Sequence, residues 1–341
     1  MTTLAQQPAP AGSDAPARPY RTGGTLLPLL ARRIVAGVFT LFAVSVIVFA
    51  ATQVLPGNAA SAVLGQSATP TRLAQLEAQM HLDRSAVAQY LSWIGGILHG
   101  NPGTSLVANQ SVASIVLPRV LASAALVILA AIIGITIGVV GGVLAAARRD
   151  GVLDQAMSIG SLVVTALPEF VVALLLVVGF ATTIFRVLPA VSIIAPGQSV
   201  LASPSELILP VATLVIVIVP YIFRMMRGAM LEALESDFVE MARLKGLSVR
   251  RVLFVHALPN ALAPVIQVIG LTLLYLAGGI VVVEFVFNFR GLGQGLVNAV
   301  TTRDIPTIQF LVLILAAFYV VVNIVTDVLV LLVSPRRRYP R

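Results

Sequence analysis

The chain has 341 residues, of which 58% are hydrophobic and only 11% are charged, and it contains no cysteine. One soluble core could not bury so much apolar surface, so the composition excludes an ordinary globular domain and indicates a membrane protein. Without cysteine, a disulfide framework, a thiolate metal site and a cysteine nucleophile are excluded as well. The net charge is +8, but because the basic residues flank apolar runs we expect no nucleic-acid partner.

The N-terminal residues differ in composition from the rest of the chain. Residues 1–24 are rich in Ala, Pro, Gln and Thr and show no periodicity, so we expect residues 1–31 to form a disordered cytoplasmic tail. The apolar run at 34–54, which follows Arg32 and Arg33, has 21 residues. The core of a signal peptide has only about 7 to 15. A membrane span is therefore favoured over a cleaved signal.

Six segments approach the roughly 20 apolar residues that a transmembrane helix needs. They are residues 34–54, 120–147, 156–185, 207–224, 261–286 and 307–333. The sequence therefore predicts an all-α polytopic membrane protein with six transmembrane helices in one membrane domain, residues 32–338.

The basic residues predict the orientation of these spans. Of the 22 Lys and Arg residues, 16 lie in the N-terminal tail, the 148–154 loop, the 224–256 loop and the C-terminus, and six lie in the other connections. Because cytoplasmic loops carry the excess of positive charge, we expect both termini and the 224–256 loop to be cytoplasmic.

The largest polar insertion, residues 55–118, then falls outside the cytoplasm. Thr69 and Pro70 are typical of a helix start, and two short amphipathic patterns follow. Their apolar positions are Leu73, Leu76 and Met80 in the first and Val87, Leu91, Ile94 and Leu98 in the second. About 60 residues with so few apolar positions would be marginal alone, so we expect an extracytoplasmic cap over the spans.

Eight charged side chains lie between residues 232 and 251. Acids come first, Arg243 and Lys245 follow, and Gly246 stands next, an order that matches the helix macrodipole and a glycine C-cap. The pattern predicts a short helix that ends at about Lys245. A second helix would start at Ser248 and be delimited by Leu258 and Pro259. The result is an elbow of two helices, and the alternative is a solvated loop stabilised by its own dipole.

The same loop resembles a motif of bacterial ABC importer permeases, Glu-Ala-Ala, three residues, Gly, nine residues, then Ile-x-Leu-Pro. In this spacing stand Glu240-Met241-Ala242, Gly246 and His256-Ala257-Leu258-Pro259, with Met241 and His256 departing from the pattern. The chain is similar, from about residue 32 to 338, to the B-type permeases of dipeptide and oligopeptide importers. "LPGNAA" at 55–60 and "GGIVVVEFVFNFRGLG" at 278–293 also carry this resemblance, although the family usually has proline in place of Arg290.

The resemblance implies the type I ABC importer permease fold and a bacterial cytoplasmic (inner) membrane location. It implies a heterodimer with a homologous second permease, two P-loop ATPase subunits and an extracytoplasmic substrate-binding protein, all working in membrane lipid by alternating access. Residues 228–258 would be the coupling loop that docks in a groove of the ATPase. The residues expected to contribute are Glu240, Ala242 and Gly246 as the docking elbow, Leu258 and Pro259 of the motif, Phe238 and Leu244 as apolar anchors, and Arg243 and Lys245 as partners of ATPase acids.

The chain itself is not expected to be an enzyme. A P-loop needs a lysine directly after glycine, and the single lysine, Lys245, follows Leu244. ATP and Mg²⁺ would bind to the partner ATPases. The three histidines are far apart in sequence and form no ligand pair, so we expect no metal or other cofactor in this chain.

Acidic residues within apolar runs are costly and often functional. We expect Glu169, after Pro168, to line a translocation pathway. Glu284 is either an extracytoplasmic gate or a packing residue, and Asp327 is expected to form a polar pair or lie near a membrane surface. The glycines at 134, 138, 141 and 142 have the spacing of a close helix-packing face.

Several alternatives stay open. Peptides are the substrate that the resemblance implies, but close relatives of such permeases move nickel, glutathione, haem or oligosaccharides. A stand-alone secondary transporter would show internal repeats, and an intramembrane enzyme would need a polar catalytic pair within the spans. Neither feature is evident in the sequence.

Overall fold

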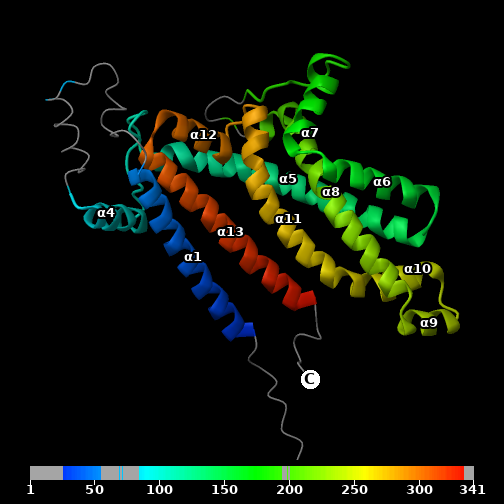
Figure 1. The fold of residues 1–341 in the computed structure, drawn as a ribbon. Coiled ribbons are helices and arrows are strands. Elements are labelled where there is room, and N and C mark those ends of the chain that lie inside the picture. The colour runs from blue at the N-terminus through cyan, green and yellow to red at the C-terminus, as the bar shows by residue number, and fades with distance from the viewer. Residues whose placement is uncertain are drawn as a thin grey trace, which may run out of the picture.

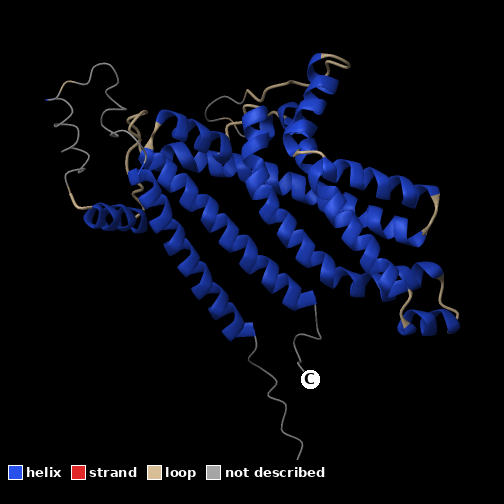
Figure 2. Cartoon of the chain, in the orientation of Figure 1, coloured by secondary structure: helices blue, strands red, loops and turns tan. Residues whose placement is uncertain are grey.

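The computed structural model describes residues 26–54, 84–193 and 200–333, together with residues 69, 71 and 198. Every secondary-structure element named in these segments is a helix (Figures 1 and 2). The prediction of an all-α polytopic protein is confirmed. The expected disorder of residues 1–24, the first cap helix around 70–80 and the last residues before 338 lie outside the described residues.

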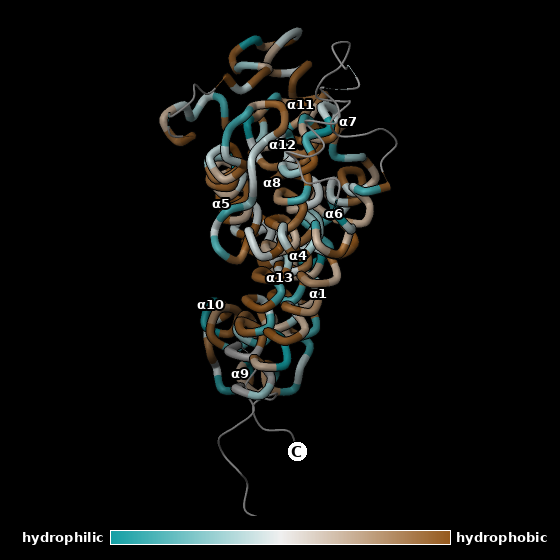
Figure 3. Tube along the Cα trace, turned by 90° about the vertical axis from the view of Figure 1, so that its left-hand side faces the viewer, coloured by the Kyte–Doolittle hydropathy of each residue, from teal (hydrophilic) through white to brown (hydrophobic). Residues whose placement is uncertain are grey.

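Five helices of the described segments are long and apolar enough to cross a membrane. They are α1 (Leu26–Val54), α5 (Val112–Ala147), α8 (Pro204–Leu234), α11 (Leu258–Val286) and α13 (Ile305–Val333). Apolar residues run along them, whereas hydrophilic positions gather on the connections beside α9 (Asp237–Leu244) (Figure 3). The N-terminal end of α1 and the C-terminal end of α13 lie at the same end of the bundle as α9 (Figure 1).

The shorter elements connect or cover the long helices. They are α4 (Ala86–Leu98), α6 (Val152–Ala166), α7 (Glu169–Leu176), the π-helix η2 (Val177–Thr182), the 3-10 turn η3 (Val200–Ala202), α10 (Val249–Arg251), the π-helix η4 (Val252–Ala257) and α12 (Leu292–Thr302).

The third predicted span, residues 156–185, is not one straight helix. Its residues belong to α6 and to the α7–η2 segment, which are bent by 106° at a short break. The break falls at Leu167, which is extended (φ −90°, ψ 131°), and Pro168. Proline disfavours helical geometry in the residue before it and has no N–H to donate, which explains the bend.

Two helices also begin earlier than predicted. α1 starts at Leu26, inside the tail expected to reach residue 31, because Pro28 lies in the first turn, where a missing N–H costs no hydrogen bond. α5 starts at Val112 and continues through Pro118, so the polar insertion ends before that proline and not at it.

The glycines of α5 form a packing face against α8, as predicted. All four are buried: Gly134, Gly138, Gly141 and Gly142. A Cβ atom added to Gly138 would lie 2.7 Å from Cβ of Ile222, and one added to Gly142 would lie 2.6 Å from Cβ of Met226. Because such distances are below van der Waals contact, only glycine allows the two helices to approach this closely.

Polar side chains connect neighbouring elements at both ends of the bundle. Arg33 of α1 and Asp327 of α13 form an ion pair with a 2.9 Å Nε–Oδ2 distance, which agrees with the polar pair expected for Asp327. At the other end, buried Asp304 precedes α13 and accepts hydrogen bonds from Ser105 Oγ (2.5 Å), Leu106 N (3.1 Å) and Thr307 Oγ1 (2.7 Å). The loop before α5 is thereby attached to the start of α13.

Candidate coupling site at the 228–258 loop

The charged loop is shorter than the sequence suggests, because α8 continues to Leu234. Residues 228–234, predicted to open the loop, form the last turns of this spanning helix, since no proline stands there and Gly228 is tolerated within a helix. Only Glu235 and Ser236 separate α8 from α9. Ser236 Oγ donates to the Ala233 carbonyl over 2.5 Å, which closes the end of α8.

α9 has the ends that its sequence predicts. Asp237 and Glu240 lie in its first turn and Arg243 in its last, which matches the helix dipole. Gly246 has φ +75°, its N–H donates to the Arg243 carbonyl (2.9 Å), and the Leu247 N–H donates to the Ala242 carbonyl (3.3 Å). A left-handed glycine with these two bonds is a helix C-cap that other residues adopt only with strain.

The second arm of the elbow does not end at Pro259. α10, η4 and α11 form one continuous helical segment from Val249 to Val286, and Pro259 stands at the start of the α-helical part. The π-helical turns of η4 change the hydrogen-bond register just before the proline, and Asn260 Nδ2 donates to the His256 carbonyl (2.8 Å). Ser248 holds the N-cap position, but its side chain makes no capping hydrogen bond.

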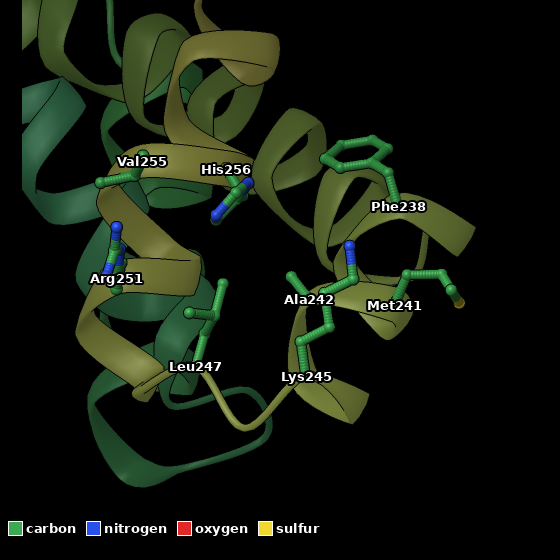
Figure 4. A pocket seen from close by; sticks show the side chains of 8 residues that line it. All are labelled: Phe238, Met241, Ala242, Lys245, Leu247, Arg251, Val255 and His256. Atoms are coloured by element: carbon green, nitrogen blue, oxygen red, sulfur yellow. The ribbon is translucent and has the colours of Figure 1, made fainter.

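α9 packs against η4 through small and aliphatic side chains. Val239 and Ala242 are buried together with Val252 and Leu253 of η4. A groove of about 330 Å³ lies between the two elements (Figure 4). Its lining residues are Phe238, Met241, Ala242, Lys245, Leu247, Arg251, Val255 and His256. The groove is therefore lined mainly by apolar side chains, together with the cations Lys245 and Arg251.

Three of the predicted site residues, Phe238, Ala242 and Lys245, meet in this groove. The other predicted site residues of α9, Glu240, Arg243 and Leu244, are exposed and lie outside the groove lining. Leu258 and Pro259 lie at the start of α11, outside the groove lining.

The part of the groove that η4 and its neighbours supply was not predicted from the sequence. These residues are Leu247, Arg251, Val255 and His256. His256 stands where the motif has isoleucine, and this departure was the one signal in the sequence that pointed to it.

Two ion pairs attach this end of α8 to the α5–α6 turn. Asp154 at the start of α6 is buried and receives Nε (2.5 Å) and Nη2 (2.7 Å) of Arg227 from α8. Arg149 pairs with Glu235, directly before α9. These pairs were not predicted from the sequence, because their partners are separated by 73 and 86 residues along the chain and give no local signal.

Glu284 is buried completely and caps a helix. It accepts hydrogen bonds from Ser123 Oγ (2.5 Å) and from the backbone N–H groups of Gly293 (2.7 Å) and Gln294 (3.2 Å) at the start of α12. A carboxylate at a helix N-terminus satisfies the free N–H groups there. Of the two roles expected for Glu284, these contacts favour packing.

Glu169 is partly buried. It is the first residue of α7, its carboxylate lies beside Tyr275 of α11, and it contacts Gly279, where a Cβ would collide with it. Tyr221 of α8 approaches Tyr275 with ring centroids 6.1 Å apart. The bend at Pro168 thus places the Glu169 carboxylate next to the Tyr275 hydroxyl.

The structure therefore combines long apolar helices with a short helix, α9, that lies at one end of the bundle and is connected to α8 and to the segment 249–286, an arrangement suited to a membrane transport protein. Comparison with known families agrees. Residues 138–339 match the family model described as the binding-protein-dependent transport system inner membrane component. Residues 26–127 match the model for the N-terminal part of such membrane components.

Individual relatives extend over nearly the whole chain. A probable peptide ABC transporter permease of Sinorhizobium fredii is 34% identical over 90% of this chain and 98% of its own. A putative peptide transport system permease of Brucella abortus is 32% identical over 91% and 99%. The di/tripeptide transport system permease of Pseudomonas aeruginosa is 33% identical over 93% and 100%.

The chain belongs to the family of binding-protein-dependent transport system inner membrane components. It is a multi-pass protein of the bacterial inner membrane and a permease component of an ABC transporter, not a catalytic subunit.

Proposed function

We propose that the chain is one permease half of an ATP-driven importer that moves peptides into the cytoplasm. The observation that carries the proposal is the coupling elbow formed by α9 and η4 on a chain whose relatives are named as peptide permeases. In this proposal both termini and the elbow are cytoplasmic, which is consistent with the shared location of α9 and the described helix ends (Figure 1).

The exposed surface of α9 suits a protein partner. Phe238 is 44% exposed, Met241 is 54% exposed and Leu244 is 75% exposed, although all three are apolar and lie at the polar end of the bundle. Arg243 and Lys245 stand among them. An aromatic and aliphatic patch edged by cations fits a groove on an ATPase subunit that offers apolar walls and carboxylates at its rim.

The groove itself would receive a side chain from the same partner. Its lining includes the apolar residues Met241, Ala242 and Val255 and the cations Lys245 and Arg251. An apolar side chain followed by an acid would fill the volume and pair with the cations. Phe238, which also lines the groove, and Leu244, which lies outside it, would be the apolar anchors of α9.

Movement of α9 would reach several spans at once. Two residues join it to α8, and the continuous segment 249–286 joins it to α11. The pair Asp154–Arg227 adds α6. Because rigid helices transmit displacement along their length, closure of the ATPases would tilt these three elements together and open the pathway alternately to the two sides.

Glu169 is our candidate for the pathway. A peptide carries an α-ammonium group, and the partly buried carboxylate of Glu169 beside Tyr275 offers it a charge-assisted hydrogen bond. Gly279 leaves the space that Glu169 occupies. Glu284 would instead stabilise the helices around the pathway. Its hydrogen bonds to Ser123 of α5 and to the start of α12 form a clamp that holds α5, α11 and α12 together.

The energy would come from other subunits. The only lysine is Lys245, so the chain lacks the lysine of a P-loop. The complete assembly would contain a homologous second permease, two P-loop ATPases that bind ATP and Mg²⁺, and an extracytoplasmic binding protein that delivers the peptide.

Co-purification tests this proposal directly. The tagged chain, solubilised in mild detergent, should bring with it a second six-span permease and one or two P-loop ATPases that mass spectrometry identifies. Gly246→Val should abolish ATPase recovery and peptide uptake, because valine is strained at φ +75°. Gly228→Val is the matched control, since a Cβ there meets open space within α8. A homodimer without ATPases, or full uptake in Gly246→Val, would refute the proposal.

A further inference from the structure

α4 has a surface that the function proposed above does not explain. Its 13 residues, AVAQYLSWIGGIL, carry no charge, and none of them is buried. Val87 is 69% exposed, Leu91 60% and Leu98 80%. The sequence pattern placed these residues on one face of a helix expected to cover the spans, but the structure leaves that face uncovered by the described residues.

A different side of α4 holds it against α1. Tyr90 contacts Phe49 edge to face at 5.4 Å between centroids, Trp93 stacks on Phe49 at 6.0 Å, and the Tyr90 hydroxyl shares a 2.8 Å hydrogen bond with Ser45. Gln53 donates to Gln89 over 2.8 Å. These contacts place α4 beside the last turns of α1, at the end away from Leu26, and α4 runs across this end (Figure 1).

The exposed face of α4 continues a surface that already lies in lipid. α1 is a candidate membrane span, and its Phe39, Phe42 and Ile47 are 69%, 55% and 66% exposed. Residues 87, 91 and 98 are spaced i, i+4 and i+11 and share one side of the helix, whereas Ser92, which is exposed, lies about 100° around the helix from Leu91 and outside that apolar face. The apolar surface of α4 therefore adjoins that of the span.

The length of α4 and its aromatic residues indicate how a bilayer would cover the exposed face of this helix. A helix of 13 residues is about 20 Å long, which is too short for the roughly 30 Å hydrocarbon core. Tyr and Trp concentrate where that core meets the headgroups, and α4 carries one of each. An uncharged apolar face exposed to water would be unfavourable, but it is stable when it lies in the interface.

We propose that α4 is an interfacial anchor: it lies in the bilayer interface beside the end of α1, with Val87, Leu91 and Leu98 among the upper acyl chains and Ser92 toward water. The occupant of this face is lipid, not the binding protein or the second permease. The anchor fixes the level of the end of α1 in the membrane. This inference does not depend on the substrate or on ATPase coupling.

The chain offers a clean test, because it has no cysteine and Trp93 is its only tryptophan. Leu91→Cys and Ser92→Cys, each labelled with an NBD fluorophore, are compared in the full-length chain reconstituted in phosphatidylcholine bilayers with its co-purifying subunits. We expect a lipid carrying a shallow nitroxide to quench the label at 91 and aqueous iodide to quench the label at 92. Their adjacency makes each variant the control for the other.

Other patterns would overturn the inference. Iodide quenching at both positions would place α4 in water, and a label at 91 that neither agent reaches would mean that a protein covers this face. The unmodified chain provides a second measurement when it is reconstituted without tryptophan-containing partners. Trp93 fluorescence should then fall more with shallow than with deep nitroxide lipids, and the reverse order would contradict an interfacial position.

Discussion

The pair Asp154–Arg227 allows a prediction in which the two partners are not equivalent. Both oxygens of Asp154 accept hydrogen bonds from Arg227, and Oδ2 also accepts the Asp150 N–H over 3.0 Å. The Asp154 side chain is 2% exposed, whereas that of Arg227 is 28% exposed. Removal of the arginine therefore leaves the more deeply buried charge without its partner.

The exposures set the expected magnitudes. Arg227→Met should destabilise the chain by about 3–5 kcal/mol, because it leaves the buried Asp154 carboxylate without its partner. Asp154→Ala should cost about 1.5–3 kcal/mol, because the guanidinium can still reach water while the hydrogen bonds to a charged acceptor are lost. The double variant carries no stranded charge and should be more stable than Arg227→Met alone.

The free energy of unfolding of each variant can be measured in mixed detergent micelles that contain increasing mole fractions of SDS. The thermal unfolding midpoint in detergent provides a second measurement. Arg224→Met on the same helix is the control, because Arg224 is exposed and the described residues offer it no ion pair. If the two single substitutions cost the same and their effects simply add in the double variant, the assumption that burial decides the cost would be refuted.

Three further predictions follow from local geometry. Gly246→Val should lose uptake and ATPase association with little change in membrane insertion, whereas Gly228→Val should keep both; co-purification and transport assays distinguish them. Glu284→Gln should destabilise the chain by about 1–3 kcal/mol, because an amide group replaces one of the acceptors for Ser123 Oγ and the α12 N–H groups, and an unchanged thermal midpoint would contradict the clamp. Gly138→Val should disrupt the α5–α8 contact and lower the yield of folded chain in size-exclusion chromatography, whereas Gly160→Val, with no atom near its Cβ, should match the unmodified protein.

The sequence alone determined the features that depend on residues close to one another in the chain. Long uncharged apolar runs can only be stable in a bilayer, so the spans were predictable. The order acid, base, glycine placed α9 correctly, because the macrodipole and the left-handed C-cap act within one or two turns. Glycine spacing predicted the packing face of α5 for the same reason.

Only the tertiary structure decided how these elements meet. A proline has different effects in different contexts: Pro168 breaks a span, whereas Pro118 and Pro259 lie within or at the start of helices that continue. The partners of Asp154 and Glu284 are far away in sequence, and the apolar face of α4 could equally have covered the spans. Long-range contacts decide each of these outcomes, because local preferences of about 1 kcal/mol are smaller than the free energy of packing and of pairing buried charges.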